Sequence, residues 1–129
     1  MIEKKQRVII ADNHAMFREG LRALLATDEQ LEIVAEAEDG RMAIQQSLTL
    51  EPDLILMDLT MPHTNGTDAI GPIKSRLPHT KIIVLTIHNS EEHIQATLRA
   101  GADGYVLKDD SHEDLVKAIN SVPVSYTHL

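Results

Sequence analysis

With 129 residues, 43% of them hydrophobic and 2% aromatic, the chain has the size of one domain with an aliphatic core. It contains no cysteine, which excludes disulfides and thiolate chemistry, and no apolar run near the roughly 20 residues that span a bilayer. Its formal net charge of −8 argues against direct nucleic-acid binding, because such binding requires a basic surface.

Short aliphatic runs predict the strands of a parallel sheet. Three of these runs show no alternation with polar residues, so each is expected to be buried on both faces, as parallel strands are. Two weaker runs, the second and the fifth along the chain, are expected nearer the sheet edges. In chain order the runs are Val8–Ala11, Glu32–Ala35, Leu54–Met57, Ile82–Leu85 and Gly104–Leu107.

Amphipathic stretches between and after these runs predict helices. Apolar residues at helical spacing define their buried faces. The stripes are Phe17, Leu21, Leu24 and Leu25; Ala43, Ile44 and Leu48; Ile94 and Leu98; and Leu115, Val116 and Ile119. Side chains able to cap a helix precede several of them, with Asn13, Asp39, Asn89 and Ser111 as the candidates. A strand followed by a helix, five times over, predicts an open α/β sheet covered on both sides.

The third helix contains the pair Gly71-Pro72 inside the stretch Ala69–Leu77. A proline in a helix interior costs about 3 kcal/mol, and the residue before it avoids the helical region. We therefore expect the regular helix to begin near Pro72, with residues 66–71 forming a loop or a distorted turn.

Polar side chains follow four of the predicted strands, where open α/β sheets bind their ligands. These residues are Asp12 and Asn13, Asp58 and Thr60, Thr86, and Lys108. Clustered carboxylates suit Mg²⁺, and a carboxylate can attack phosphorus to form an acyl phosphate. A lysine can neutralise the transferring phosphoryl group, and a threonine hydroxyl can donate a hydrogen bond to it.

The sequence resembles a bacterial response-regulator receiver domain, in particular the subfamily with a LuxR-type (NarL-like) output. The resemblance spans roughly residues 7–120 and is carried by Val8–His14, Asp53–Pro62, Asn65–Gly66, Val84–Thr86, Ala100–Tyr105 and Leu107–Asp109. It implies a flavodoxin-like, doubly wound sheet of five parallel strands in the order 2-1-3-4-5, with five helices.

The resemblance also assigns roles to individual residues. Asp58 is the implied phosphoryl acceptor, and Lys108 and Thr86 are the implied contacts to the phosphoryl oxygens. Thr86 and Tyr105 resemble a switch pair, in which the hydroxyl moves and the aromatic ring turns inward. The implied Mg²⁺ ligands are Asp12, Asn13, Asp58 and the backbone carbonyl of Thr60. Most receivers have an acid in place of Asn13, so we expect weaker Mg²⁺ binding here.

The implied function is that of a regulatory switch, not an enzyme with its own substrate. It would take its phosphoryl group from a histidine kinase, promote its own phosphorylation and dephosphorylation, and dimerise when phosphorylated. We expect a cytoplasmic receiver over residues 1–121 and a poorly ordered tail over 122–129. DNA would be bound only by a helix-turn-helix output domain that lies outside this chain.

Two other functions stay open at this stage. An aspartate-based phosphohydrolase would use the same nucleophile, although its motif has a second aspartate where this chain has Thr60. A phosphorylation-independent interaction module is compatible with Asn13. A histidine metal site is not expected, because His88 and His93 are spaced i, i+5 and the other histidines form no ligand set.

Overall fold

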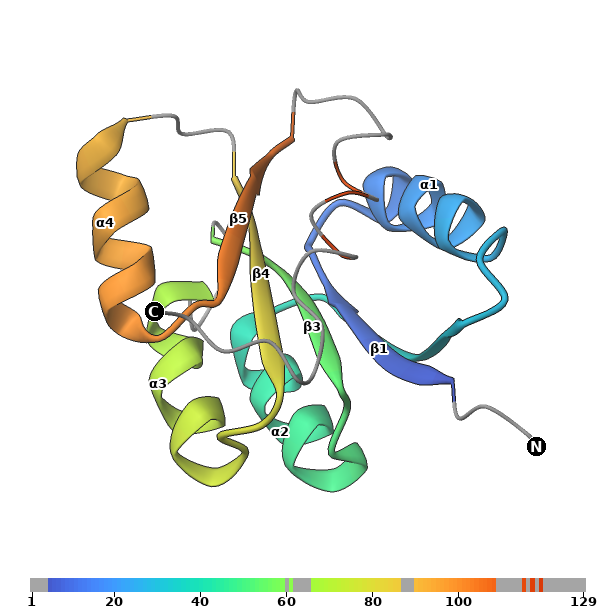
Figure 1. The fold of residues 1–129 in the computed structure, drawn as a ribbon, viewed down its shortest axis with the longest axis horizontal. Helices are drawn as coiled ribbons and strands as arrows, with labels where there is room; N and C mark the ends of the chain where they lie inside the picture. The colour runs from blue at the N-terminus through green and yellow to red at the C-terminus, as the bar shows by residue number, and fades with distance from the viewer. Residues whose placement is uncertain are drawn as a thin grey trace.

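The computed structural model describes residues 5–59, 61, 66–86, 90–108, 115, 117 and 119. A single parallel sheet of five strands, in the order β2-β1-β3-β4-β5, forms its centre (Figure 1). The strands are β1 Gln6–Ala11, β2 Leu31–Ala37, β3 Leu54–Asp58, β4 Lys81–Thr86 and β5 Gly104–Leu107. The structure confirms all five predicted strands. It also confirms their edge or central positions and the predicted strand order.

The central strands lack polar alternation because helices cover both faces of the sheet. In β1, Ile9 and Ala11 face one hydrophobic cluster, whereas Val8 and Ile10 face the other. Successive side chains of a strand point to opposite sides, so each side of β1 must be apolar. The five-stranded sheet therefore separates two aliphatic cores.

The helices with described bounds are α1 Ala15–Leu25, α2 Gly40–Leu50, α3 Gly66–Arg76 and α4 Glu91–Ala100. Residues of α2 and α3 line one core, and α1 lines the other together with Leu115 and Ile119. These last two residues and Lys117 have helical backbone, but the rest of the predicted fifth helix lies outside the described residues. No helix in the described ranges is long and apolar enough to cross a membrane.

Two of the predicted helix caps are wrong by one residue. The N-cap of α1 is His14 rather than Asn13, and its side chain makes no capping hydrogen bond. The N-cap of α4 is Ser90 rather than Asn89, and its hydroxyl accepts the His93 N–H. Asp39 caps α2 as predicted, by accepting the Met42 N–H at 2.8 Å. The candidate cap Ser111 lies outside the described residues.

The predicted start of the third helix is also wrong. The helix begins at Gly66, not near Pro72, so the proline stands inside it. Ala69 and Ile70, which the prediction left in a loop, are fully buried and pack against the core, and this burial stabilises the first turns. Gly71 has no Cβ to clash with the proline ring, which removes part of the steric objection.

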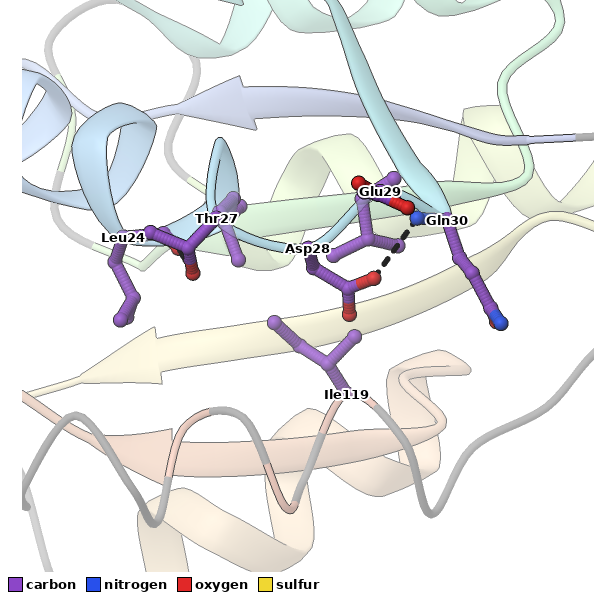
Figure 2. A pocket seen from close by; sticks show the side chains of 8 residues that line it. Leu24, Thr27, Asp28, Glu29, Gln30 and Ile119 are labelled. Atoms are coloured by element: carbon purple, nitrogen blue, oxygen red, sulfur yellow. Dashed lines mark hydrogen bonds between the residues drawn. The ribbon is translucent and has the colours of Figure 1, made fainter.

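A pocket of about 520 Å³ lies at the edge of the sheet where the strands begin (Figure 2). The end of α1, the start of β2 and Ile119 line it, and Asp28 accepts the Gln30 N–H there. This is the edge opposite to the one where the predicted site residues follow the strands.

Candidate functional site

Two buried carboxylates meet at the carboxyl ends of β1 and β3. Ala11 of β1 pairs with Met57 of β3, so the residues that follow them, Asp12 and Asp58, are neighbours across the sheet. Asp12 has no exposed surface and Asp58 is 3% exposed. The Asp12 N–H donates to the Ala37 carbonyl at 2.9 Å, which ties this turn to β2. Buried carboxylates require cationic partners to stay ionised.

Lys108 supplies a positive charge between these carboxylates. Its backbone N–H donates to the Thr86 carbonyl at 2.8 Å, which fixes the start of its side chain beside β4. Its ammonium lies 2.7 Å from Asp12 Oδ2 and 3.3 Å from Asp58 Oδ2. With both carboxylates ionised, these three side chains together have a net charge of −1. A crevice with this charge can accept a further cation.

Thr86 and Tyr105 lie on adjacent strands at the same edge. Thr86 is buried and pairs in register with Leu107, two residues after Tyr105. Tyr105 is 41% exposed. The pair predicted from the sequence therefore lies on neighbouring strands, with Thr86 buried and Tyr105 exposed.

The predicted metal ligands are only partly brought together. Asp12 and Asp58 share Lys108, whereas Asn13 is exposed at the turn before α1. Thr60, whose carbonyl was a predicted ligand, lies outside the described residues.

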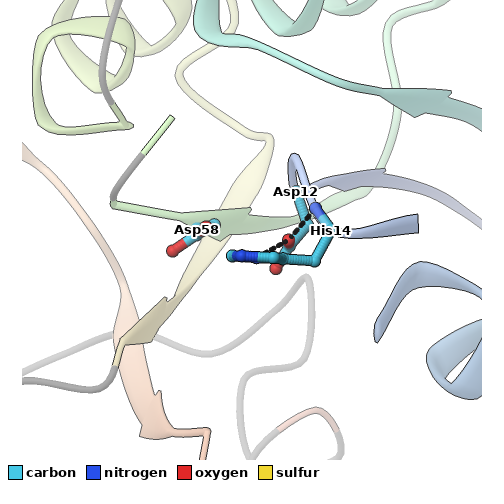
Figure 3. Close-up of side chains that lie close together, drawn as sticks. All are labelled: Asp12, His14 and Asp58. Carbon is cyan, nitrogen blue, oxygen red and sulfur yellow. Dashed lines mark hydrogen bonds and ion pairs between the residues drawn. The ribbon is translucent and has the colours of Figure 1, made fainter. Parts of the chain in front are cut away.

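His14 lies in the site but was not predicted from the sequence. Its backbone N–H donates to Asp12 Oδ1 at 2.8 Å, and its ring Nδ1 lies 3.2 Å from the same oxygen. Figure 3 shows the ring extending from Asp12 toward Asp58. Asp12, His14 and Asp58 each offer a ligand atom within 4.8 Å of the others. The spacing Asp-x-His after a strand was the available signal, because aspartate often accepts the N–H two residues on.

Arg18 is a second residue of the site that was not predicted from the sequence. Its guanidinium donates to the Asp12 carbonyl at 2.5 Å and to Glu36 Oε1 at 3.2 Å. It therefore links α1, β2 and the turn that holds Asp12. Its side chain thus helps to hold the backbone of Asp12 in place, and does so through its contacts with Asp12 and Glu36 rather than with Asp58.

The fold and this crevice define a doubly wound α/β domain with an acidic, lysine-containing site at the carboxyl edge of its sheet. The chain belongs to the response regulator receiver domain family, whose sequence profile matches residues 8–120.

Transcriptional regulators of the DegU and NarL type are among its relatives. The chain is 39% identical over 120 residues to the transcriptional regulatory protein DegU of Brevibacillus brevis, covering 93% of this chain and 51% of that protein. It is 37% identical over 113 residues to the nitrate/nitrite response regulator protein NarL of Escherichia coli K12, covering 88% of this chain and 52% of that protein. The chain thus spans about half the length of these curated relatives. The predicted subfamily is confirmed.

Solved receiver structures agree with the fold. A two-component response regulator of the LuxR family from Aurantimonas superposes with a TM-score of 0.87 at 32% identity, over 92% of this chain and 85% of that one. The isolated receiver domain of RcsB from Salmonella enterica, solved with the phosphomimetic BeF3⁻, gives a TM-score of 0.84 at 34% identity. The superposition covers 91% of this chain and 87% of that one. The flavodoxin-like fold class is therefore confirmed.

Proposed function

We propose that this receiver domain is a phosphorylation-dependent switch whose phosphoryl acceptor is Asp58. The observation that carries the proposal is the ammonium of Lys108, which lies within ion-pair distance of both Asp12 and Asp58. A nucleophilic carboxylate beside a fixed cation, at the carboxyl edge of an α/β sheet, suits attack on a phosphoryl group.

In the proposed reaction, a carboxylate oxygen of Asp58 attacks the phosphorus of a phosphohistidine on a sensor kinase. The new O–P bond forms as the N–P bond breaks, and the electron pair of that bond stays on the kinase imidazole. Lys108 neutralises charge on the phosphoryl oxygens, and the Thr86 hydroxyl donates a hydrogen bond to one of them. Later attack by water on the phosphorus returns the Asp58 carboxylate and releases inorganic phosphate.

The site residues fit a divalent cation, because the two buried carboxylates share one ammonium and leave negative charge in the crevice. The proposed ligands are Asp12, Asp58, Asn13 and the Thr60 carbonyl. When bound, Mg²⁺ supplies electrostatic stabilisation of the transferring group.

Phosphorylation adds up to about two negative charges at the end of β3 and would shift a two-state equilibrium. We propose that Thr86 then moves toward the phosphoryl group and that the exposed Tyr105 ring turns inward. The result would be a surface for homodimerisation. In the whole protein, a cytoplasmic response regulator, this change would control a DNA-binding output domain, as the transcriptional regulators among its relatives suggest.

Incubation with acetyl phosphate and Mg²⁺, followed by intact mass spectrometry, tests the proposal. We expect a gain of one phosphoryl group in the wild type and none in Asp58→Asn. Asp28→Asn, at the opposite edge of the sheet, is the matched control and should be phosphorylated like the wild type. No gain in the wild type, or a gain that survives Asp58→Asn, contradicts the proposal.

The same preparation separates the two rival functions. Continuous release of phosphate from phosphate monoesters would indicate a phosphohydrolase, whereas a switch gives a stoichiometric, alkali-labile phosphate. Partner binding that is unaffected by Asp58→Asn would indicate a phosphorylation-independent module.

A further inference from the structure

Arg18 closes the first turn of α1 and reaches back to the turn that carries Asp12. Its N–H donates to the His14 carbonyl at 3.0 Å, and its Nη1 donates to the Asp12 carbonyl at 2.5 Å. Side chains of a helix lean toward its N-terminus, which favours this direction. The Asp12 N–H donates to the Ala37 carbonyl of β2 at 2.9 Å. The backbone of Asp12 is therefore held on one side by a strand and on the other by the Arg18 side chain.

The contact with Arg18 fixes the peptide group between two proposed metal ligands. The Asp12 carbonyl and the Asn13 N–H belong to one planar peptide group, and the Cα atoms of both residues lie in the same plane. A hydrogen bond to the carbonyl therefore affects the directions in which both side chains leave the backbone. Asp12 Oδ1 also accepts the His14 N–H at 2.8 Å, so the carboxylate is restrained as well.

Two acidic residues hold the Arg18 side chain, which is only 12% exposed. Its Nε lies 3.2 Å from Glu36 Oε1, and its Nη2 lies 3.7 Å from Glu38 Oε1. A guanidinium is a rigid planar group with five N–H donors, so it can contact these oxygens and a carbonyl at the same time. A lysine ammonium is a compact charge on a flexible stem and cannot reproduce this bridge.

We infer that Arg18 is a positioning residue for Asp12 and thereby raises the affinity of the site for Mg²⁺. The inference rests on the proposed function, because it concerns the cation that Asp12 and Asp58 are proposed to hold. Groups that orient metal ligands contribute about tenfold to 100-fold to metal affinity. The charge of Arg18 alone has the opposite effect, because a positive charge near two carboxylates disfavours a further cation. Removal of the side chain therefore lowers the Mg²⁺ affinity if Arg18 acts by positioning, and raises it if Arg18 acts only by charge.

Isothermal titration calorimetry with Mg²⁺ distinguishes these two effects. We expect the Mg²⁺ affinity of Arg18→Met to fall about tenfold or more, because Asp12 loses its support. The affinity of Arg18→Lys should fall about threefold or more, although the charge is kept, because the bridge is lost. Arg22→Met is the matched control. Arg22 lies on the same helix, 3.3 Å from Glu36 Oε2, and its side chain is 56% exposed, so its charge is screened and the affinity should stay within about twofold of the wild type.

The dependence of phosphorylation on Mg²⁺ is a second measurement, and a purely structural role of Arg18 would not produce the expected result. With acetyl phosphate as the donor, Arg18→Met should need about tenfold more Mg²⁺ for half of its maximal rate. The rate at saturating Mg²⁺ should stay within about twofold of the wild type, because Asp58 and Lys108 are unchanged. Thermal unfolding identifies the temperature range in which each variant is folded, and Arg18→Lys carries the test if Arg18→Met does not fold.

An unchanged or higher Mg²⁺ affinity in Arg18→Met overturns the inference. An equal loss in Arg22→Met, or a rate that stays low at saturating Mg²⁺, also overturns it, because either result indicates a general structural defect. Wild-type affinity in Arg18→Lys overturns the role of the guanidinium bridge. If the wild type is phosphorylated in these cases, only this inference fails. A wild type that acquires no phosphoryl group contradicts the proposed function itself.

Discussion

The ammonium of Lys108 lies 4.5 Å from the centroid of the Phe17 ring. Phe17 is partly buried against the core on the α1 side of the sheet, so its ring is a fixed surface. A cation over an aromatic face gains about 0.5 to 2 kcal/mol. The lysine that follows β5 is thus held by an aromatic ring of α1 as well as by the carboxylates after β1 and in β3.

Phe17→Leu tests whether this contact matters for the chemistry. The substitution keeps an apolar side chain but removes the ring face, so the lysine should sample more positions. We expect phosphorylation by acetyl phosphate to slow about two- to fivefold, which corresponds to the lower range of a cation–π contact. Time courses of intact mass measure the rate. Leu24→Met, on the same helix, is the control, and a Phe17→Leu rate equal to the wild type would exclude a role for the ring.

Lys108→Met should separate cation binding from phosphoryl transfer. Removing the ammonium leaves two buried carboxylates without their shared positive charge, so Mg²⁺ affinity should rise by about fivefold or more. The phosphorylation rate should nevertheless fall by about 100-fold, because the charge that stabilises the transferring group is lost. Isothermal titration calorimetry measures the Mg²⁺ affinity, and time courses of intact mass measure the phosphorylation rate. Lys74→Met, which removes an ion pair with Asp103 instead, should leave both near the wild-type values. A lower Mg²⁺ affinity in Lys108→Met would refute this account of the crevice.

Asn13→Asp should raise Mg²⁺ affinity. The substitution adds a negative charge to the turn between Asp12 and His14, next to the proposed ligands. A further carboxylate at such a site should tighten Mg²⁺ binding by about fivefold to tenfold. Titration of Mg²⁺ against both proteins measures the change. Equal affinities would show that the amide does not weaken the site.

Gly71 and Pro72 should be coupled in their effects on stability. Pro72 is exposed and has no N–H to donate inside α3, so Pro72→Ala should stabilise the fold by about 1 to 3 kcal/mol. A Cβ added at Gly71 would have no atom within 4 Å, if its chain neighbours are left out. In the Pro72→Ala background, Gly71→Ala should therefore stabilise the fold by about 0.5 to 1 kcal/mol. With Pro72 present, the same substitution should leave the stability unchanged or lower it.

Urea unfolding of the two single variants and the double variant gives the coupling free energy of this pair. Additive effects would show that the missing Cβ of Gly71 does not explain how α3 tolerates its proline.

The sequence was sufficient for the sheet and for the centre of the site. Unbroken aliphatic runs such as Leu54–Met57 are required when both faces of a strand are covered, so they identified the central strands directly. Parallel strands end at one edge, which is why Asp12, Asp58 and Lys108 could be grouped before the structure was known. The strand order came from the family resemblance rather than from the residues alone.

The residues that were missed depend on tertiary contacts or on local turns. His14 enters the site because the chain bends around the Asp12 carboxylate, and no helical or strand period reports such a bend. Arg18 was one of several charged residues on α1 until its contact with the Asp12 carbonyl distinguished it. The start of α3 was wrong because local propensity at Pro72 is outweighed by the burial of Ala69 and Ile70.

The pairing of β1 with β3 has a consequence for synthesis of the protein. Val8 pairs with Leu54, and Lys108 contacts Asp12, so these contacts join distant parts of the chain. Such contacts form late in folding, because the entropy cost of closing a long loop precedes the favourable free energy of the contact. A ribosome must therefore release the chain beyond residue 108 before the crevice can assemble. Until then the aliphatic strands are incompletely paired, and this is the period in which chaperones protect exposed strand edges.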